Sequence, residues 1–331
     1  MKAACISRHG GPEVIEITQR PQPVCAAGQV LVRVKACGLN HLDLWVRKGG
    51  TRPFPLPLIP GSDIAGVRED TGQEVVVFPA VWSQPTGRPG ASVAIAEGFS
   101  ILGAARDGGM AEYVAVPEQN CLPKPAALSF EQAAAVPVVF TTAWHMLMQR
   151  AQLRVGEWVL ITAAGSGVSH AAIQIAHLAG AKVIATSSTD EKLEKAQSIG
   201  ADYIINYKTQ DVAAQVRSIT GGAGADIVFD HVGAANWQAN IAALARGGRL
   251  VLCGVTSGAE VTLNLASLYY QAQSVLGSTL GTIDDLARCL ALLAEGKLHV
   301  VIDKVFKLDH LTDAHRYLEE QGQFGKVVVK V

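Results

Sequence analysis

Between residues 158 and 277 the sequence alternates short apolar runs with segments of helical periodicity. The apolar runs cover 158–162, 182–186, 203–205, 226–229, 250–252 and 274–277, and the helical segments cover 170–178, 189–199, 212–219 and 237–245. Strands that alternate with helices of this length form βαβ units and a parallel sheet. Helices cover both faces of such a sheet, which explains why these runs are apolar throughout. The pattern predicts an α/β fold with a doubly wound, six-stranded parallel sheet and a ligand at the carboxyl ends of its strands.

The sequence on either side of this region has a different pattern of apolar and polar residues. Residues 29–36 alternate apolar and polar side chains, as a strand with one face on a core does, and 74–77 and 110–116 repeat the signal. After residue 280 the pattern predicts helices at 283–295 and 311–320 and strands at 300–305 and 326–331. We therefore expect a first domain at 1–125, a dinucleotide-binding domain at 126–280 and a return segment at 281–331 that folds back onto the first domain.

The bulk composition excludes several classes of protein. Lys and Arg number 28 and Asp and Glu 29, so the formal charge of -1 lacks the positive excess that nucleic acids or anionic membranes require. The amino terminus has no apolar signal segment, and no apolar run approaches the roughly 18 residues of a membrane span. None of the 6 cysteines forms a C-x-x-C pair, and we expect a cytoplasmic protein with reduced thiols.

The first apolar run is followed by a turn of small residues, Ala163-Ala164-Gly165-Ser166-Gly167-Val168-Ser169. Between a strand and a helix, such a turn lets the backbone approach a pyrophosphate, and the helix N-terminus offers free N–H groups. The turn lacks the strict G-x-G-x-x-G spelling, and an ordinary tight βα turn has a similar sequence. Its place in the strand pattern favours dinucleotide binding through Gly165, Ser166, Gly167 and Val168.

The end of the second strand indicates which nicotinamide cofactor fits. NAD-binding units usually place an acidic residue there, bonded to the ribose 2′-hydroxyl. Here the strand leads into Ser187, Ser188 and Thr189, and the first carboxylate is Asp190, which suits a helix cap. The hydroxyls together with Lys192 fit a 2′-phosphate, so the sequence favours NADP(H). The alternative is that Lys192 is an ordinary solvated helix residue.

Several motifs occur in a characteristic order along the whole chain. They are 35–43 (KACGLNHLD), 58–63 (LIPGSD), 108–113 (GGMAEY), the turn at 163–169, 200–202 with 205–207, 230–233 (DHVG), 247–250 (GGRL) and 324–328 (FGKVV). With these motifs the chain resembles the medium-chain dehydrogenase/reductase superfamily, and within it the zinc-independent, quinone oxidoreductase-like branch. The resemblance implies a GroES-like β-barrel catalytic domain, built from both ends of the chain, that encloses the Rossmann domain in sequence.

The resemblance also predicts that the chain holds no metal. Zinc alcohol dehydrogenases of this superfamily bind a catalytic zinc through Cys, His and Cys, and the matching positions here are Asn40, Ser62 and Val138. Valine cannot bind zinc, and Asn and Ser are poor ligands beside thiolate and imidazole. The stretch that matches the structural-zinc lobe, 80–102, contains no cysteine. We interpret Cys37 as a structural or substrate-near thiol.

The resemblance implies further contacts to the cofactor. Besides the turn, Ser187, Ser188 and Lys192, they are Asn40, Thr142, Tyr207, Val232, Val255, Thr256, Ser278, Thr279 and Lys326. The turn departs from the family at Ser169, which replaces a glycine that allows close helix–strand packing. We expect this serine to shift the helix slightly, which bears on cofactor affinity.

Without a Lewis acid, hydride transfer favours acceptors that are already activated. Quinones and α,β-unsaturated carbonyls accept hydride at carbon and spread charge to oxygen, so the protein needs orientation and a few hydrogen-bond donors. Asn40 is a candidate donor, His41 or Trp45 a second, and His41 a candidate proton source. Asp43 is a further candidate in the site, although such a residue more often orients its neighbours. For His41, a phosphate contact or a structural role is an alternative that the sequence favours equally or more.

The sequence leaves two other functions open: a zinc alcohol dehydrogenase whose ligands are misaligned, and an NADPH-binding protein with a structural or regulatory role. Relatives often pair the edge of the sixth strand, near 274–278, across a two-fold axis, which shields an open sheet edge. We therefore expect a homodimer that acts on a small-molecule quinone or enone.

Overall fold

The computed structural model describes residues 1–49, 54–84, 87 and 91–331. The chain forms two compact units, one from Met1–Thr141 with Thr282–Val331 and the other from Thr142–Gly281. Helix α2 (Phe130–Ala134) packs against strands β3 (Gln29–Gly38) and β4 (Asp63–Arg68). For this reason the structure groups residues 126–141, which the sequence pattern assigned to the dinucleotide-binding domain, with the first unit.

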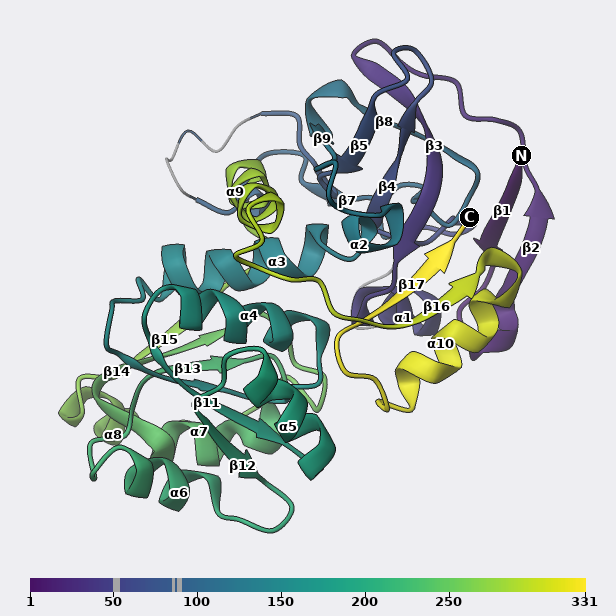
Figure 1. Cartoon of the computed structure of the whole chain (residues 1–331). Helices are drawn as coiled ribbons and strands as arrows, with labels where there is room; N and C mark the ends of the chain where they lie inside the picture. Colours follow the sequence, from purple (N-terminus) through teal and green to yellow (C-terminus); the bar gives the residue numbers. More distant parts are fainter. Residues whose placement is uncertain (50–53, 85–86, 88–90) are drawn as a thin grey trace. The chain divides into compact units, whose positions relative to one another are not determined.

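The second unit is built on a six-stranded parallel sheet (Figure 1). The strands lie in the order β12-β11-β10-β13-β14-β15, and every neighbouring pair is parallel. Chain order runs outward from β10 to β12 on one side and from β13 to β15 on the other, which confirms the predicted doubly wound sheet. The strands are β10 (Trp158–Ile161), β11 (Lys182–Ser187), β12 (Tyr203–Asn206), β13 (Ala225–Asp230), β14 (Leu244–Leu252) and β15 (Ser274–Gly277).

Helices cover both faces of this sheet, with α4 (Gly167–Leu178) on one side and α6 (Val212–Ile219) and α7 (Trp237–Ala243) on the other (Figure 1). The unit also contains α5 (Asp190–Ser198), α8 (Leu265–Tyr270), a 3-10 helix at Ala234–Asn236 and a π-helical segment at His145–Arg150. Side-chain oxygens of Ser166, Thr189 and Asp211 cap α4, α5 and α6 by accepting a backbone N–H from the first turn. The central strands β10, β11 and β13 are buried between these helices, which accounts for their continuous apolar runs.

The first unit contains a seven-stranded sheet made from both ends of the chain (Figure 1). Six strands follow the order β16-β17-β3-β4-β5-β9, and β8 also pairs with β3. Strand β17 runs antiparallel to β3, with Val328 opposite Gly38. The carboxyl-terminal strands thus extend the sheet that the amino-terminal strands begin. Beyond β3 and β4, its members are β5 (Glu74–Val77), β8 (Tyr113–Pro117), β9 (Cys121–Pro123), β16 (Ile302–Lys307) and β17 (Lys326–Lys330).

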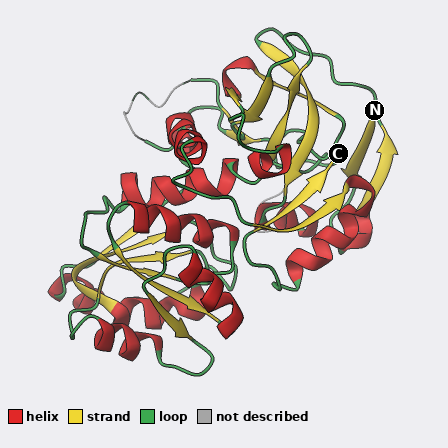
Figure 2. Cartoon of the chain, viewed as in Figure 1, coloured by secondary structure: helices red, strands yellow, loops and turns green. Residues whose placement is uncertain are grey.

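Smaller strand pairs and helices complete this unit (Figure 2). Strands β1 (Lys2–Ile6) with β2 (Ile15–Gln19), and β6 (Ala80–Val81) with β7 (Ser100–Ile101), form antiparallel pairs. Val30, Val32 and Val34 point one face of β3 into the core, as their alternation predicts. Among the described residues, no helix is long and apolar enough to cross a membrane. Besides α2, its α-helices include α1 (His41–Lys48), α9 (Ile283–Ala294) and α10 (Leu311–Glu319), and α3 (Pro137–Trp144) spans the boundary between the units in sequence.

Candidate active site

Most predicted nucleotide contacts of the second unit lie along one edge of its sheet. Because the strands are parallel, the residues that follow them share the carboxyl edge, where ligands of such sheets bind. These residues are the turn at 163–169 after β10, Ser187 and Ser188 at the end of β11, Tyr207 after β12, Val232 after β13, Val255 and Thr256 after β14, and Ser278 and Thr279 after β15. Lys192 lies in the first turn of α5. Thr142 does not follow a strand of this sheet; it is a buried residue of α3.

The turn after β10 is held against the neighbouring strand β11. Ala163 adopts a left-handed φ of 50°, which costs a residue other than glycine about 1 kcal/mol, and Ala164 N donates to Thr186 O at 2.8 Å. Ser166 then caps α4, its Oγ accepting the N–H of Ser169 at 3.1 Å. The free N–H groups of α4 therefore begin where β10 and β13 lie side by side, the place at which this kind of sheet binds anions.

A side-chain network supports this turn, and the sequence did not reveal it. His231, which follows β13, places Nε2 2.9 Å from Ser166 Oγ and 3.0 Å from Ser169 Oγ. Ser169 Oγ donates to Thr162 O at 2.7 Å, and Thr162 Oγ1 donates to Asp230 Oδ1 at 2.9 Å. Burial lowers the pKa of His231, although the Asp230 carboxylate opposes the shift, so the ring is neutral at pH 7. The network joins β10, α4 and the segment after β13.

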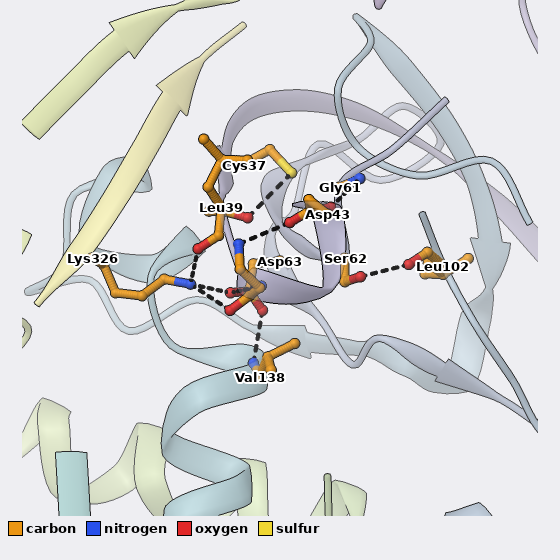
Figure 3. Close-up of polar contacts among 11 residues, drawn as sticks. Cys37, Leu39, Asp43, Gly61, Ser62, Asp63, Leu102, Val138 and Lys326 are labelled. Atoms are coloured by element: carbon orange, nitrogen blue, oxygen red, sulfur yellow. Dashed lines mark hydrogen bonds and ion pairs between the residues drawn. The ribbon is translucent and has the colours of Figure 1, made fainter. Parts of the chain in front are cut away.

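The other predicted site residues lie in the first unit, where Lys326 and Asp63 form a buried ion pair (Figure 3). Lys326, on β17, places Nζ 2.9 Å from Asp63 Oδ2, and the two side chains are 2% and 0% exposed. The same ammonium donates to Asn40 Oδ1 at 2.7 Å and to Leu39 O at 2.6 Å. Asn40 Nδ2 donates to Asp63 Oδ2 at 2.9 Å. These added hydrogen bonds offset the desolvation of the two charges.

Asp43 ties the start of α1 to the loop before β4. Its Oδ2 accepts Asn40 N at 2.8 Å and its Oδ1 accepts Gly61 N at 3.0 Å. Gly61 adopts a φ of 101°, and a Cβ there would lie 2.6 Å from Cys37 Sγ, so only glycine fits. Burial raises the pKa of Asp43 to about 7, and the nearby Asp63 carboxylate adds to the rise. Since both oxygens are bonded to backbone, Asp43 orients the loop that carries Asn40.

The remaining candidates of this unit lie around the ion pair. His41 and Trp45 are half-buried residues of α1, and the hydrogen bonds that join Asn40 to Asp43, Asp63 and Lys326 do not run through them. Cys37 is fully buried, and burial, with Asp43 and Asp63 adding to it, holds the pKa of its thiol well above the usual value. Cys37 is therefore a packed thiol and not a nucleophile. Asp63 is the residue of this group to which the sequence motifs assigned no role.

Comparison with known proteins matches both units. Residues 26–126 match the alcohol dehydrogenase GroES-like domain, and residues 167–295 match the zinc-binding dehydrogenase family. A zinc-type alcohol dehydrogenase-like protein of Schizosaccharomyces pombe is 36% identical over 332 residues, which cover 97% of this chain and 94% of that protein. The chain belongs to the medium-chain dehydrogenase/reductase superfamily.

Other members of the superfamily extend the match. The quinone oxidoreductase of Homo sapiens is 29% identical over 338 residues, which cover 99% of this chain and 97% of that protein. The crystal structure of an NAD-dependent alcohol dehydrogenase is 44% identical, covers 100% of both chains and has a TM-score of 0.94. The fold therefore combines a GroES-like domain with a Rossmann domain, and the protein is an oxidoreductase of the medium-chain type.

The zinc positions of the superfamily carry a donor set that does not fit zinc in this chain. Ser62 Oγ donates to Leu102 O at 2.7 Å and is directed away from Lys326 (Figure 3). Val138 offers only its backbone N–H, which donates to Asp63 Oδ1 at 2.7 Å. Asn40 is bonded to an ammonium and a carboxylate. Across the ranges that the structure describes, no three His, Cys, Asp or Glu side chains gather as metal ligands.

Proposed function

We propose that this protein transfers a hydride from NADPH to a quinone or an α,β-unsaturated carbonyl without the help of zinc. The observation that supports this best is the buried pair of Asp63 and Lys326, which engages Asn40 at the first zinc position of the superfamily. Zinc would polarise an unactivated carbonyl, and an amide N–H polarises it far less. An acceptor that spreads the incoming charge to its own oxygen does not need that help.

The residues of the two units have separate tasks in this proposal. NADPH supplies the hydride when it is bound. The N–H groups at the start of α4, with Gly165, Ser166, Gly167 and Val168, hold the pyrophosphate. Asn40 donates its amide N–H to the acceptor oxygen that gains charge, and Asp43 keeps Asn40 in place. His41 is the candidate proton donor and Trp45 a candidate second donor. The other proposed cofactor contacts are Thr142, Tyr207, Val232, Val255, Thr256, Ser278 and Thr279.

The proposed preference for NADPH rests on the end of β11. Ser187 is buried at the strand end, Ser188 follows it, and Lys192 lies in the next helical turn, which together offer two hydroxyls and a cation to a 2′-phosphate. The nearby carboxylate of Asp190 accepts a hydrogen bond from Asn206 Nδ2 at 2.7 Å. A ribose 2′-hydroxyl would have to compete with this bond for the acidic side chain.

The proposal is tested by steady-state kinetics with NADPH and NADH, each against an ortho-quinone, an enone and a simple alcohol–ketone pair. We expect turnover of a quinone or enone with NADPH that survives dialysis against a chelator. Lys192→Ala should raise the KM for NADPH about tenfold, because one charge-assisted hydrogen bond to the 2′-phosphate is lost. The KM for NADH should stay unchanged. Lys195→Ala is the matched control, because Lys195 lies on the same helix in an exposed pair with Glu191. No turnover with either acceptor class would contradict the proposal.

A second candidate is a zinc-dependent alcohol dehydrogenase, which the match to the zinc-binding dehydrogenase family favours. Metal analysis of the purified protein separates the two. One equivalent of zinc, with alcohol oxidation that a chelator abolishes, would decide for the second candidate. Tight NADPH binding with no turnover of any acceptor would instead favour a structural or regulatory role.

A further inference from the structure

We propose that Asp63 and Lys326 are positioning residues whose ion pair fixes the side-chain amide of Asn40 in one orientation, with a free N–H for the substrate oxygen. The inference deepens the proposed reductase function and rests on it for the identity of the oxygen. The orientation itself follows from the hydrogen bonds of Asn40 to Lys326 and Asp63, two side chains whose ion pair Figure 3 shows.

The two partners of Asn40 differ in what they can offer to an amide. An ammonium has only donors, so the atom of Asn40 that lies 2.7 Å from Lys326 Nζ must be the oxygen. A carboxylate has only acceptors, so the atom 2.9 Å from Asp63 Oδ2 must be the nitrogen. Rotating the amide by half a turn would set oxygen against carboxylate and NH2 against ammonium. The pair therefore removes the ambiguity that an asparagine side chain usually has.

Lys326 has no hydrogen left for a substrate or a cofactor. Its three N–H groups go to Leu39 O at 2.6 Å, Asn40 Oδ1 at 2.7 Å and Asp63 Oδ2 at 2.9 Å. The side chain is 2% exposed. Lys326, which the family resemblance placed near the cofactor, thus acts through Asn40.

Asp63 is also committed within the protein. Its Oδ1 accepts a hydrogen bond from Val138 N at 2.7 Å. Its Oδ2 accepts hydrogen bonds from Asn40 Nδ2 and Lys326 Nζ. The pair thereby joins the residues before α1, the start of β4, the start of α3 and β17. Two of the three zinc positions of the superfamily, at Asn40 and Val138, are held together by an ion pair in this chain. The opposite charges cancel, so what the cluster can offer to a substrate is an oriented N–H.

Asn40 keeps the group that a substrate needs. Among the described residues Nδ2 donates to Asp63 alone, and it carries a second hydrogen. Asn40 is 8% exposed, more than Asp63 or Lys326. The free N–H is thus attached to a side chain that the pair prevents from turning over.

The sharpest test reverses the orientation of the Asn40 amide without leaving an unpaired buried charge. Removing Asp63 or Lys326 alone would strand its partner, whereas the double variant Asp63→Asn with Lys326→Met removes both charges. The amide introduced at position 63 keeps an oxygen for Val138 N and turns its NH2 toward Asn40. Asn40 then has to present its oxygen to that NH2, and its own amide rotates by half a turn. Lys330→Met is the matched control, since Lys330 lies on the same strand but is 64% exposed.

Two readouts are compared, one of which needs no substrate. In the nucleotide-free protein, hydrogen exchange of the Asn40 side-chain NH2, assigned by its loss in Asn40→Ala, should be about tenfold faster in the double variant than in wild type or Lys330→Met. With NADPH and a quinone, kcat/KM should fall about 100-fold in the double variant and in Asn40→Ala. Adding Asn40→Ala to the double variant should lower it no further, and the dissociation constant of NADPH should stay within about threefold of wild type.

The outcomes separate the inference from the proposed function. If hydrogen exchange of the Asn40 NH2 is unchanged in a folded double variant, the ion pair does not fix the amide orientation, whatever substrate the enzyme reduces. Multiplicative losses when Asn40→Ala is added would show that the pair does not act through Asn40. If exchange is faster in the double variant but the wild type turns over no acceptor, the inference about the Asn40 orientation stands and the reductase proposal is contradicted.

Discussion

Ser169 occupies the position at which the superfamily turn usually has a glycine, and its surroundings explain how a side chain fits there. Its hydroxyl hydrogen is used in the 2.7 Å bond to Thr162 O, so the 3.0 Å contact with His231 requires a hydrogen on His231 Nε2. That ring nitrogen then also faces Ser166 Oγ as a donor, at 2.9 Å. Ser166 Oγ already accepts the N–H of Ser169. The hydrogen of the Ser166 hydroxyl is therefore left to donate to a phosphate oxygen.

Substituting Ser166 tests this assignment. Ser166→Ala removes the donor to the phosphate and the cap of α4, and we expect the dissociation constant of NADPH to rise about tenfold, as the loss of one hydrogen bond to a charged group predicts. Titration of NADPH fluorescence measures the constant. Ser198→Ala is the control, because Ser198 Oγ is an exposed helix hydroxyl that donates to Lys195 O. Equal affinities in the two variants would contradict the assignment.

Helices α1 and α10 meet through a partly buried ion pair. Arg47 of α1 is fully buried and donates to Glu319 Oε1 of α10 at 2.5 Å. His315 lies one turn before Glu319 and is also fully buried, and its ring nitrogens have no hydrogen-bond partner among the described residues. Burial lowers the pKa of His315 to about 3, and the Arg47 guanidinium adds to the shift. The packing of α10 on α1 therefore requires a neutral imidazole.

This requirement makes stability depend on pH in a defined window. The unfolded chain takes up a proton at His315 near pH 6.5 and the folded chain only near pH 3, so the contribution is complete above pH 6.5 and is lost as the pH falls toward 3. His315→Leu should flatten the pH dependence of the unfolding free energy between pH 6.5 and 4.5 by up to about 1.4 kcal/mol per pH unit. Urea titrations at each pH measure it.

The matched control for this experiment is His310→Leu. His310 lies just before α10 and is exposed, beside Asp313 at 3.3 Å. Its replacement should leave the pH dependence of the unfolding free energy the same as in the wild type. If the slope of His315→Leu also stayed that of the wild type, the buried imidazole would not be the source of the pH dependence.

Elements were predictable where periodicity is local and strong. The run at 274–277 and the segment at 212–219 coincide with β15 and α6, because a short apolar strand or an amphipathic helix shows its pattern within a few residues. The pairs β1–β2 and β6–β7 were not predicted. Strands β6 and β7 are two residues each and pair with partners distant in sequence, so no alternation develops. The strand expected from Met110 begins at Tyr113, since Met110 O accepts Ala4 N from β1.

At the scale of the whole molecule, sequence order alone accounts for much of the candidate site. The doubly wound topology brings residues after β10, β11, β12, β13, β14 and β15 to one edge, so the predicted nucleotide contacts of the second unit follow from knowing the strands. The supports of these residues do not follow. Lys326 reaches Asn40 and Asp63 from the other end of the chain, and His231 reaches Ser166 from the end of the neighbouring strand β13. Such contacts depend on side-chain packing, which a motif read along the chain does not contain.

Of the two edge strands of the second unit's sheet, β12 and β15, the edge at β15 bears on the assembly of the molecule. Strand β15 pairs with β14 on one side and is the last strand of its sheet among the described residues. Large apolar side chains lie exposed on it and on the preceding segment, namely Val261, Leu265, Tyr269, Tyr270 and Val275, of which the two tyrosines are each 67% exposed. An open edge flanked by exposed apolar groups is a template for pairing with another strand.

We expect two copies of the chain to pair through this edge. Light scattering after size exclusion should then give a mass twice the 34.8 kDa of one chain. Val275→Lys places a charge on the edge strand, where two-fold pairing would bring it beside its own copy, and should give the single-chain mass at micromolar concentration. Val155→Lys is the control, because Val155 belongs to the same unit and is 83% exposed away from any strand. A single-chain mass for the wild type would contradict the dimer. A double mass that persists in Val275→Lys would show that the interface lies elsewhere.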